Sequence, residues 1–438
     1  MKNLIFILAL SIVFFACQKG DTTTTQPPPP PPPSASLPTV NTNTISAITS
    51  TTASSSGAIT SDGGATVTAR GICWATTNAP LSTGNFTSDG TGTGTFISNL
   101  TGLTPGTFYF YRAYATNSVG TAYGVQATFT TLPLFIGNVY VVGSLSNSTY
   151  DIATIWKNGV PTSLTNGTAN AAAKSVFVSG TDVYVAGWEH IGSFNIARIW
   201  KNGLGTSLSA LNTNGIANSV FVLGTDVYVA GYEIIGGYDV ARVWKNGVGT
   251  SLPSGIQGFT FSIYVSGTDV YVTGYSGGVG SGGGLSVATL WKNGIPTYYT
   301  DGTYNAYAKS VYVSGTDVYV TGQGSGARMW KNGVPVNLTN GYDANSVLVS
   351  GTDVYVAGSY NSGISFAASV WKNGVVTVLP HINFGNAYSV FVSGADVYVA
   401  GDDSGGGYFG ARFWKNGIGT TLSPAYYDAH AYSIFVTP

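Results

Sequence analysis

The hydrophobic and polar positions of the chain repeat themselves from about residue 133 to the end. Each repeat holds a run of the type Ser-Val-Phe-Val-Ser, a run of the type Asp-Val-Tyr-Val-Ala, a variable stretch and the tetrapeptide Trp-Lys-Asn-Gly. Apolar residues at every second position indicate half-buried β-strands. In the copy that starts at Ser175 this pattern predicts four strands, over 175–179, 182–186, 197–201 and 205–208.

The tetrapeptide Trp-Lys-Asn-Gly sets the period of the repeat. It occurs seven times, with spacings of 44, 44, 47, 39, 41 and 43 residues, at Trp156, Trp200, Trp244, Trp291, Trp330, Trp371 and Trp414. Asn-Gly between two strands favours a type I′ hairpin turn, because both central residues of that turn need a positive φ. Units of four short strands and about 43 residues are typical of β-propeller blades. The period therefore predicts seven blades.

The order of the strands predicts how the ring closes. A strand of the Ser-Val-Phe-Val type first appears at Ser175, whereas the two strand types that follow it in each repeat begin earlier, at Val139 and Ala153. Its seventh copy, 433–436, stands at the C-terminus. An open array of blades would not need this offset. In a closed ring the C-terminal strand completes the first blade, so that both sheet edges are hidden. We predict an all-β chain whose residues 133–438 form a seven-bladed propeller closed by the C-terminal strand. The units resemble the Trp-x-x-Gly repeats of uncharacterised bacterial extracellular propellers.

A second folded region precedes the repeats. Over 37–132, short β-rich runs alternate with Gly, Asn, Asp and Thr turns, which predicts a small β-sandwich. The segment 101–117 resembles the E-to-F region of fibronectin type III domains. In that resemblance Leu103, Pro105 and Tyr109 form a corner whose phenol bonds back to the backbone. The resemblance implies a spacer or an adhesive module.

The first 16 residues predict a signal peptide. Lys2 precedes an apolar run, 4–16, that is too short to span a bilayer. Cys17 follows Ala16 where cleavage is expected, which resembles a bacterial lipoprotein signal whose Cys becomes the acylated N-terminus. We predict lipidation at Cys17 and therefore a membrane partner through a lipid anchor.

Residues 17–36 predict a disordered, Thr- and Pro-rich stalk. Seven prolines, 27–33, favour an extended helix that needs no core. The residues 18–21, Gln-Lys-Gly-Asp, look like the tag that sends some lipoproteins of diderm bacteria to the cell surface. An ordinary polar spacer, with an anchor that faces the periplasm, is the alternative. We expect an exported protein of the bacterial outer membrane, exposed at the cell surface.

Composition narrows the class of protein. The chain has 17 Lys and Arg against 18 Asp and Glu, a net charge of −1, which excludes a basic footprint for nucleic acid. With 8% charged and 13% aromatic residues and 60 glycines, the chain favours strands over helices. Two cysteines exclude a disulfide framework and a Cys-rich zinc cluster. Trp74 is expected in a core, and Cys73 is interpreted as a buried apolar residue rather than a nucleophile.

The predicted propeller has one constant and one variable face. The Gly-Thr-Asp and Lys-Asn-Gly turns are nearly identical in every repeat, whereas the connections at the opposite end differ in length and content. We interpret the repeated Asp as bonding its own turn backbone and the repeated Lys as solvated. Variable loops on a rigid scaffold are typical of recognition sites. Loops that merely lack a packing constraint are the alternative.

The candidate ligand-binding residues belong to the variable face. They are Trp188, Glu189, His190, Tyr232, Glu233, Asp402, Asp403, Tyr426, Tyr427, Asp428 and His430. Aromatic residues among Asn, Ser and Gly offer stacking faces, as in sugar sites and antibody paratopes, although some must fill gaps between blades. Asp402, Asp403 and Asp428, together with His430, could converge on a metal or act as acid and base. Their spacing is not that of metal ligands, so a solvated polar loop is the preferred interpretation.

The leading functional hypothesis is a non-catalytic binding or adhesion module for protein or glycan. We assign no catalytic residue, no metal and no cofactor, and we expect a monomer that does not bind nucleic acid. Nine acids against six bases on the variable half favour neutral glycans or protein over polyanions. A polysaccharide-active enzyme, which would need a convergent pair of carboxylates, is one alternative. A structural surface component is the other.

Overall fold

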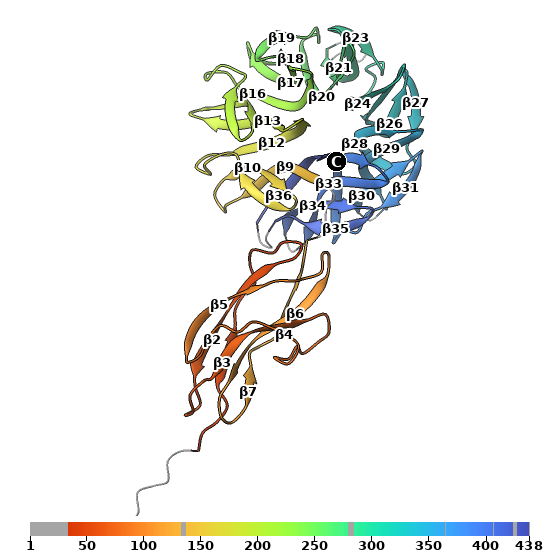
Figure 1. Ribbon diagram of the computed structural model, residues 1–438. Helices are drawn as coiled ribbons and strands as arrows, with labels where there is room; N and C mark the ends of the chain where they lie inside the picture. Colours follow the sequence, from red (N-terminus) through yellow and green to blue (C-terminus); the bar gives the residue numbers. More distant parts are fainter. Residues whose placement is uncertain are drawn as a thin grey trace, which may run out of the picture.

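The chain is all-β in the computed structural model, which describes residues 34–132, 137–278, 284–363, 365–405, 407–423 and 427–437. Within those ranges 36 strands, β1 to β36, are connected by turns (Figure 1). The described residues contain no helix long and apolar enough to cross a membrane. The predicted signal peptide, Cys17 and most of the stalk lie outside the described residues.

The N-terminal region is a sandwich of two antiparallel sheets. The first sheet has the order β1-β2-β5, with β1 Thr39–Thr42, β2 Ala53–Ser61 and β5 Gly94–Leu100. The second has the order β4-β3-β6-β7 with β8 also on β6, and comprises β3 Ala69–Ala75, β4 Asn85–Phe86, β6 Phe108–Thr116, β7 Thr121–Tyr123 and β8 Ala127–Thr130. Alternate residues of both sheets point into one apolar core, as expected of packed antiparallel sheets.

Two predictions for the sandwich are confirmed. The Tyr109 hydroxyl accepts a hydrogen bond from the backbone N–H of Thr104 at 3.0 Å, which is the predicted corner. Trp74 is buried in the core. Cys73 is also fully buried, with its sulfur 3.3 Å from the carbonyl oxygen of Pro80, and burial raises the pKa of its thiol. A buried thiol with a raised pKa is a poor nucleophile, so Cys73 is structural.

Seven four-stranded antiparallel sheets follow, and each repeats the same strand order. The innermost strands are β12 Ala171–Ser179, β16 Gly215–Leu223, β20 Gln257–Ser266, β24 Tyr307–Ser314, β28 Gly341–Ser350, β32 Phe384–Ser393 and β36 Ala429–Thr437. The second strands are β9 Asn138–Ser146, β13 Asp182–Ile191, β17 Asp226–Ile235, β21 Asp269–Gly277, β25 Asp317–Gly324, β29 Asp353–Asn361 and β33 Asp396–Gly405. The third strands, which carry the repeated Trp, are β10 Asp151–Lys157, β14 Phe194–Lys201, β18 Tyr238–Lys245, β22 Ser286–Lys292, β26 Gly326–Lys331, β30 Phe366–Lys372 and β34 Tyr408–Lys415. The outer strands are β11 Val160–Ser163, β15 Leu204–Ser207, β19 Val248–Ser251, β23 Ile295–Tyr298, β27 Val334–Asn337, β31 Val375–Val378 and β35 Ile418–Thr421.

The sheets are arranged around a common axis and resemble the blades of a β-propeller (Figure 1). We number them first to seventh by their Trp strands. The first sheet has the order β11-β10-β9-β36, so its innermost strand comes from the other end of the chain. Ser433 pairs with Val142 and Val436 with Val139 in that register. This is the pairing that the sequence predicts for the C-terminal strand.

A serine of each innermost strand links that strand to the next one around the axis. The serine Oγ accepts a hydrogen bond of 3.2–3.4 Å from a backbone N–H of the neighbouring innermost strand. The seven serines are Ser175, Ser219, Ser262, Ser310, Ser346, Ser389 and Ser433. Because β36 takes part through both its serine and its own N–H, the links run all the way round.

The repeated Trp and the Asn-Gly turns have the local structure that the sequence predicts. All seven repeated tryptophans are buried. In the Asn-Gly turns the asparagines have φ of 50–53° and the following glycines φ of 80–84°. Such positive values are those of a type I′ turn, in which Asn and Gly are the residues with least strain. The Trp strand and the outer strand therefore form the expected hairpin in every sheet.

Two sequence interpretations of the turns and loops are wrong. The repeated Asp pairs with the repeated Lys and not with its own turn backbone: in six sheets the two charged groups lie 2.7–2.8 Å apart, as in Asp182 with Lys201. The Lys side chains stay partly exposed, as expected. The variable stretches are largely strand, since β13 and β14 run on to a turn at Gly192 and Ser193. The strands lengthen there with Trp188 and Ile191, because Trp and Ile favour strands.

Candidate functional site

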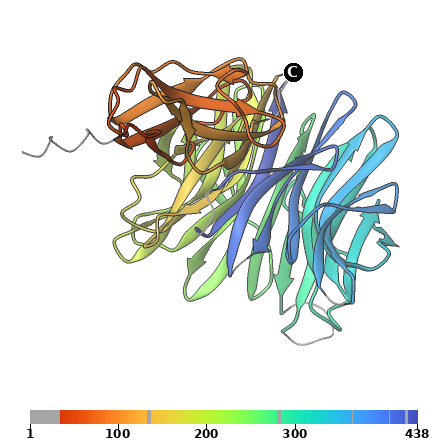
Figure 2. The ribbon, with the colours of Figure 1, turned by 90° about the horizontal axis from the view of Figure 1, so that it is seen from below.

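The two ends of the ring differ in how much they vary. We call the end with the Gly-Thr-Asp and Lys-Asn-Gly turns the constant face and the opposite end the variable face. Figure 2 shows the ring from the side, with the C-terminal end of β36, which belongs to the constant face, toward the sandwich. The first sheet also meets the sandwich there, because Leu132 lies against Gly159 of the first Asn-Gly turn.

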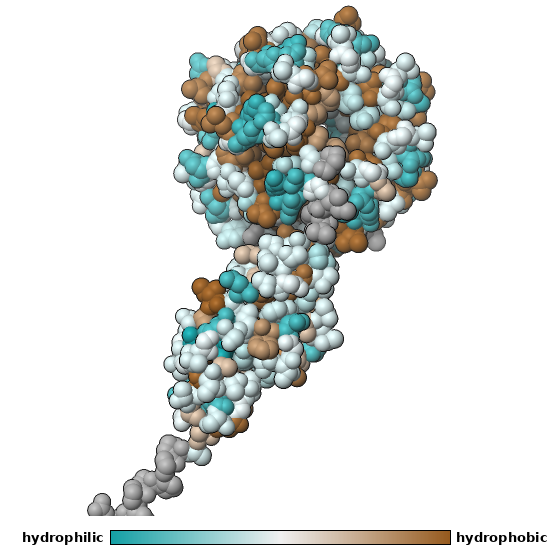
Figure 3. All heavy atoms as spheres, viewed as in Figure 1, coloured by the Kyte–Doolittle hydropathy of each residue, from teal (hydrophilic) through white to brown (hydrophobic). Residues whose placement is uncertain are grey.

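The constant face repeats the same surface in every sheet. One exposed aliphatic residue follows each Asn-Gly turn, and these residues are Val160, Leu204, Val248, Ile295, Val334, Val375 and Ile418. Figure 3 shows apolar and polar side chains alternating around the ring. On the axis, aromatic rings of neighbouring innermost strands contact one another at 4.8–5.1 Å between centroids, as Phe391 and Phe177 do with Phe435. A depression of about 980 Å³ there is lined by Phe391, Phe435 and several turn residues. Such uniformity offers little that would discriminate between ligands.

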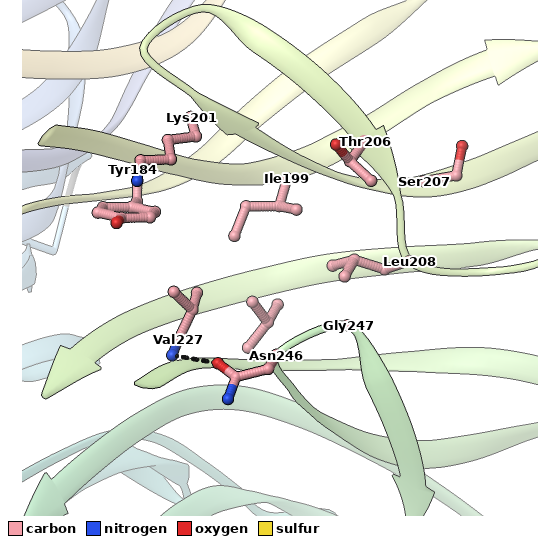
Figure 4. A pocket seen from close by; sticks show the side chains of 10 residues that line it. Tyr184, Ile199, Lys201, Thr206, Ser207, Leu208, Val227, Asn246 and Gly247 are labelled. Atoms are coloured by element: carbon pink, nitrogen blue, oxygen red, sulfur yellow. Dashed lines mark hydrogen bonds between the residues drawn. The ribbon is translucent and has the colours of Figure 1, made fainter. Parts of the chain in front are cut away.

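The pocket in Figure 4 lies between neighbouring sheets. Tyr184, Ile199 and Leu208 of the second sheet face Val227 of the third across a volume of about 240 Å³. An equivalent pocket of about 200 Å³, lined by Tyr355, Val370 and corresponding neighbours, lies between the sixth and seventh sheets. Because the pocket recurs at the same position, it follows from how the repeats pack and is not a specific site.

The variable face brings unlike residues together on the axis. Each innermost strand has a β-bulge immediately before its conserved Ser, and the residues at the bulges are Lys174, Asn218, Phe261, Lys309, Asn345, Tyr388 and Tyr432. Two residues earlier stand Ala172, Ile216, Phe259, Tyr307, Asp343, Asn386 and His430. We call these fourteen residues the axial cluster. Bulges re-aim side chains, and they are common next to functional sites.

Contacts between neighbouring strands confirm that the axial cluster is continuous. The Tyr388 and Tyr432 rings lie 5.6 Å apart, and the Lys174 ammonium lies 3.6 Å from the centroid of the Tyr432 ring. The side-chain amides of Asn218 and Asn345 each donate a hydrogen bond to a backbone carbonyl of the next innermost strand. Every bulge residue is partly exposed. The cluster therefore presents its side chains to solvent as well as to each other.

One side of the axial cluster is polar. The Asp402 carboxylate is fully buried, and it lies 2.5 Å from Nδ1 of His430 and accepts a hydrogen bond from the Asn386 amide at 3.3 Å. Burial, with the nearby Asp402 charge, raises the pKa of Tyr388 well above its usual value. Lys309 forms a close ion pair with Asp343. Asp343 of the axial cluster and Asp402 of β33 beside it thus already have partners.

The opposite side of the axial cluster is aromatic. The Tyr232 and Phe259 rings are 4.3 Å apart, and Phe259 stacks on Tyr275 with centroids 5.8 Å apart and planes 6° from parallel. Tyr307 packs edge-on against Tyr275 at 5.4 Å. Phe261, the bulge residue of β20, contacts the rings of Phe259 and Tyr275. All five rings are partly exposed, so they form one contiguous aromatic surface on the third, fourth and fifth sheets.

Three of the acidic residues that the sequence singled out each pair with an Arg of the Trp strand, at the same position in three different sheets. Glu189 lies 3.3 Å from Arg198, and Glu233 lies 2.7 Å from Arg242. Asp403 lies 3.0 Å from the guanidinium of Arg412 in the same way. Burial still raises the pKa of Asp403, although Arg412 opposes that effect. These three acids hold the second and third strands together.

The interpretation of Asp402 and Asp403 as members of a solvated loop is wrong. Both are buried in β33, and their side chains have different partners because successive residues of a strand point to opposite sides. Asp428 is exposed, and its carboxylate accepts a hydrogen bond from the backbone N–H of Phe409. Among the described residues no three His, Cys, Asp or Glu side chains are placed to hold a metal ion. Of these four predicted residues, the structure brings together only Asp402 and His430.

The remaining candidates lie near the axial cluster. Trp188 pairs across the strands with Ala172 and Tyr232 pairs with Ile216, and both aromatic residues are partly exposed. His190 is exposed, with Nδ1 2.9 Å from the Asn195 side-chain oxygen. Tyr427 is exposed, whereas Tyr426 lies outside the described residues.

The sequence interpretation missed most of the axial cluster. Lys174, Phe261, Tyr388 and Tyr432 were not among the candidates because they stand inside a strand, next to the conserved Ser. A signal was nevertheless present: this position holds Lys, Asn, Phe, Lys, Asn, Tyr and Tyr in the seven copies, inside an otherwise nearly constant run. Variation at one position of a repeated strand indicates a surface with a specific role.

Comparison with known proteins gives only distant likenesses. No family model matches the chain, and no curated protein matches it. Among solved structures, TolB from Acinetobacter baumannii is 11% identical with a TM-score of 0.43, covering 74% of this chain and 79% of that chain. A DUF4784 family protein from Bacteroides caccae is 9% identical with a TM-score of 0.27, covering 91% and 98% of the two chains.

Proposed function

We propose that the seven repeated sheets are a seven-bladed β-propeller closed by β36, preceded by a fibronectin type III-like domain. The offset of the strand types along the chain and the pairing of β36 with β9 support the closure. The hydrogen bond from Thr104 N–H to Tyr109 supports the fibronectin type III-like assignment, because that corner is characteristic of immunoglobulin-like sandwiches.

The protein is a lipoprotein of the bacterial outer membrane, exposed at the cell surface. The apolar run that ends at Ala16, followed directly by Cys17, supports export and acylation. The proline tract 27–33 supports a stalk that holds the folded regions away from the lipid. In this arrangement the fibronectin type III-like domain acts as a further spacer.

The propeller is a non-catalytic module that binds a glycan on its variable face. The observation that carries this function is the contiguous, partly exposed aromatic surface of Tyr232, Phe259, Tyr275 and Tyr307. Sugar rings stack on such surfaces, while neighbouring hydroxyl, amide and charged groups bond the sugar hydroxyls. Asn386 and His430 supply polar groups of this kind across the axis. Asp343 and Asp402 each pair with a cation or His of their own, which disfavours them as the convergent carboxylate pair that a glycosidase needs.

A glycan array tests the proposal with the full-length mature protein in detergent. We expect selective binding by the wild type and a loss of at least about tenfold in affinity for Tyr275→Ala with Tyr307→Ala, because two stacking faces are removed. Lys201→Ala with Lys245→Ala, on the constant face, is the matched control and should bind as the wild type does. No glycan binding by the wild type, or loss only in the control variant, would overturn the proposal.

A further inference from the structure

Lys174 differs from the other lysines of the repeated sheets. Six of them pair with the repeated Asp of their own sheet, and Lys309 pairs with Asp343. Lys174 forms no ion pair with any carboxylate among the described residues, and neither does Lys157, which lies at the constant face over the Tyr140 ring. Lys174 is therefore the axial cation that has no anionic partner on the variable face.

The groups around Lys174 leave the residue partly exposed and its ammonium without an ion pair among the described residues. On its own strand the residue two positions earlier is Ala172, where the other sheets have larger side chains. From β36 the Tyr432 ring lies beneath the ammonium, and His430 stacks on that ring at 5.6 Å. The charge of Asp151, on β10, raises the pKa of Lys174, but Asp151 forms no ion pair with it. Asp402 is already bonded to His430.

Burial destabilises the charged form of Lys174 while no anion is bound. Desolvation lowers the pKa of Lys174 to about 8, and the Asp151 charge opposes that effect only in part. A desolvated ammonium gains more from a bound anion than a solvated one does, because water no longer competes for its hydrogen bonds. The fold thus leaves a poorly solvated positive charge beside a surface suited to sugar rings.

We propose that Lys174 binds the carboxylate of an acidic sugar, so that the glycan bound on the variable face contains a uronic acid. This inference rests on the proposed glycan-binding function and names its ligand class. The ammonium donates a hydrogen bond to one carboxylate oxygen of the sugar. Trp188 pairs across the strands with Ala172, two positions before Lys174 on β12, and its ring is partly exposed. A sugar ring attached to that carboxylate would stack on this ring.

The local charge agrees with a single acidic group rather than a polyanion. On the variable half the other cations of the second, third and seventh sheets, Arg198, Arg242 and Arg412, are held by acids. Lys309 is likewise held by Asp343. Arg328 of the fifth sheet contacts Ser325 and the Tyr304 ring. A densely charged polymer would therefore meet only Lys174 and Arg328 as cations without an ion pair among the described residues of this half. A sugar chain in which acidic and neutral residues alternate fits better.

Binding of a matched pair of oligosaccharides tests this inference. The full-length mature protein in detergent is titrated with a uronic acid oligosaccharide and with the same oligosaccharide after reduction of its carboxyl groups to alcohols. The wild type is expected to prefer the acidic form by about 10- to 100-fold, as charge-assisted hydrogen bonds imply. Lys174→Met should abolish this preference, so that the acidic and the reduced oligosaccharide bind this variant with equal affinity. Lys174→Arg should keep most of it, and Lys201→Met on the constant face should have no effect.

The pH dependence gives a second readout. Above pH 8 the ammonium loses its proton, so the preference of the wild type for the acidic form should decline there, and Lys174→Met should show no such decline. An unchanged melting temperature of Lys174→Met shows that a lost preference is not due to unfolding.

The other outcomes separate the two proposals. Equal binding of both oligosaccharides by the wild type would overturn the acidic subsite and leave glycan binding intact. A preference for a sulfated oligosaccharide, dependent on Lys174, would overturn the carboxylate class. If no glycan of the array or of this pair bound at all, the proposed function itself would fall.

Discussion

The Oγ of Ser433 accepts a hydrogen bond of 3.3 Å from the backbone N–H of Val176, which lies 257 residues earlier in the chain. Ser389 makes the same contact with Ile434 on the other side of β36. The last strand is therefore held by both neighbouring sheets as well as by its pairing with β9. A terminal strand in this position is a structural member of the ring and not a tail.

Removal of residues 433–438 is expected to destabilise the ring. Ile434 and Val436 are buried in the first sheet, and their loss would also expose the edge of β9. Burial of each such side chain contributes about 1.5–3 kcal/mol, so the melting temperature should fall by about 10 °C or more. Ser433→Ala, which removes one hydrogen bond, should cost only about 1 kcal/mol. Calorimetry on the two variants would contradict the closure if their melting temperatures were equal.

Substitution of Asp402 is expected to be far more costly than substitution of Asp428. Asp402→Ala leaves the partly buried polar groups of His430 and Asn386 without their acceptor, which costs about 1–3 kcal/mol. Asp428→Ala removes an exposed carboxylate that bonds one backbone N–H and should cost less than about 1 kcal/mol. Urea unfolding of both variants makes the comparison. A smaller loss of stability for Asp402→Ala than for Asp428→Ala would mean that the bonds of Asp402 to His430 and Asn386 contribute little.

The constant face should make stability depend on acid pH. The hydrogen bond from Lys201 holds the pKa of Asp182 below its ordinary value of 3.8, and the equivalent Lys does the same in five further sheets. A carboxylate whose pKa is depressed by folding stabilises the native state above the unfolded pKa, and this contribution is lost as pH falls through the folded pKa. The double variant Asp182→Asn with Asp226→Asn should therefore be less stable than the wild type at pH 6. The difference should shrink toward pH 2. A difference that stayed constant with pH would argue against these ion pairs as its source.

Acylation should depend on Cys17. The wild type is expected to incorporate labelled palmitate in a bacterium that processes lipoproteins, and Cys17→Ser is expected to incorporate none, because the serine hydroxyl is not the substrate of that modification. Detergent partitioning of the two forms is the accompanying measurement. Equal partitioning would show that the membrane association has another origin.

Much of the architecture is encoded in short-range signals. The spacing of Trp156, Trp200 and their later copies defines the period, and Asn-Gly defines the hairpins because few other dipeptides adopt two positive φ values without strain. The position of Ser433 at the end of the chain indicates the closing strand. Each of these signals is readable from the sequence because it depends on a few adjacent residues or on their repetition.

The axial cluster depends instead on the tertiary structure. Lys174 and Tyr432 are neighbours only because the ring brings the second sheet beside the strand from the C-terminus. Likewise, Asp402 and Asp403 are adjacent in sequence, yet one faces His430 and the other Arg412, since the pleat of β33 sends them to opposite sides. The sequence by itself determined the repeat, the turns and the pairing of the C-terminal strand with β9. Only the packing of seven sheets around one axis decided which side chains meet there, because each sheet contributes a single strand to that axis.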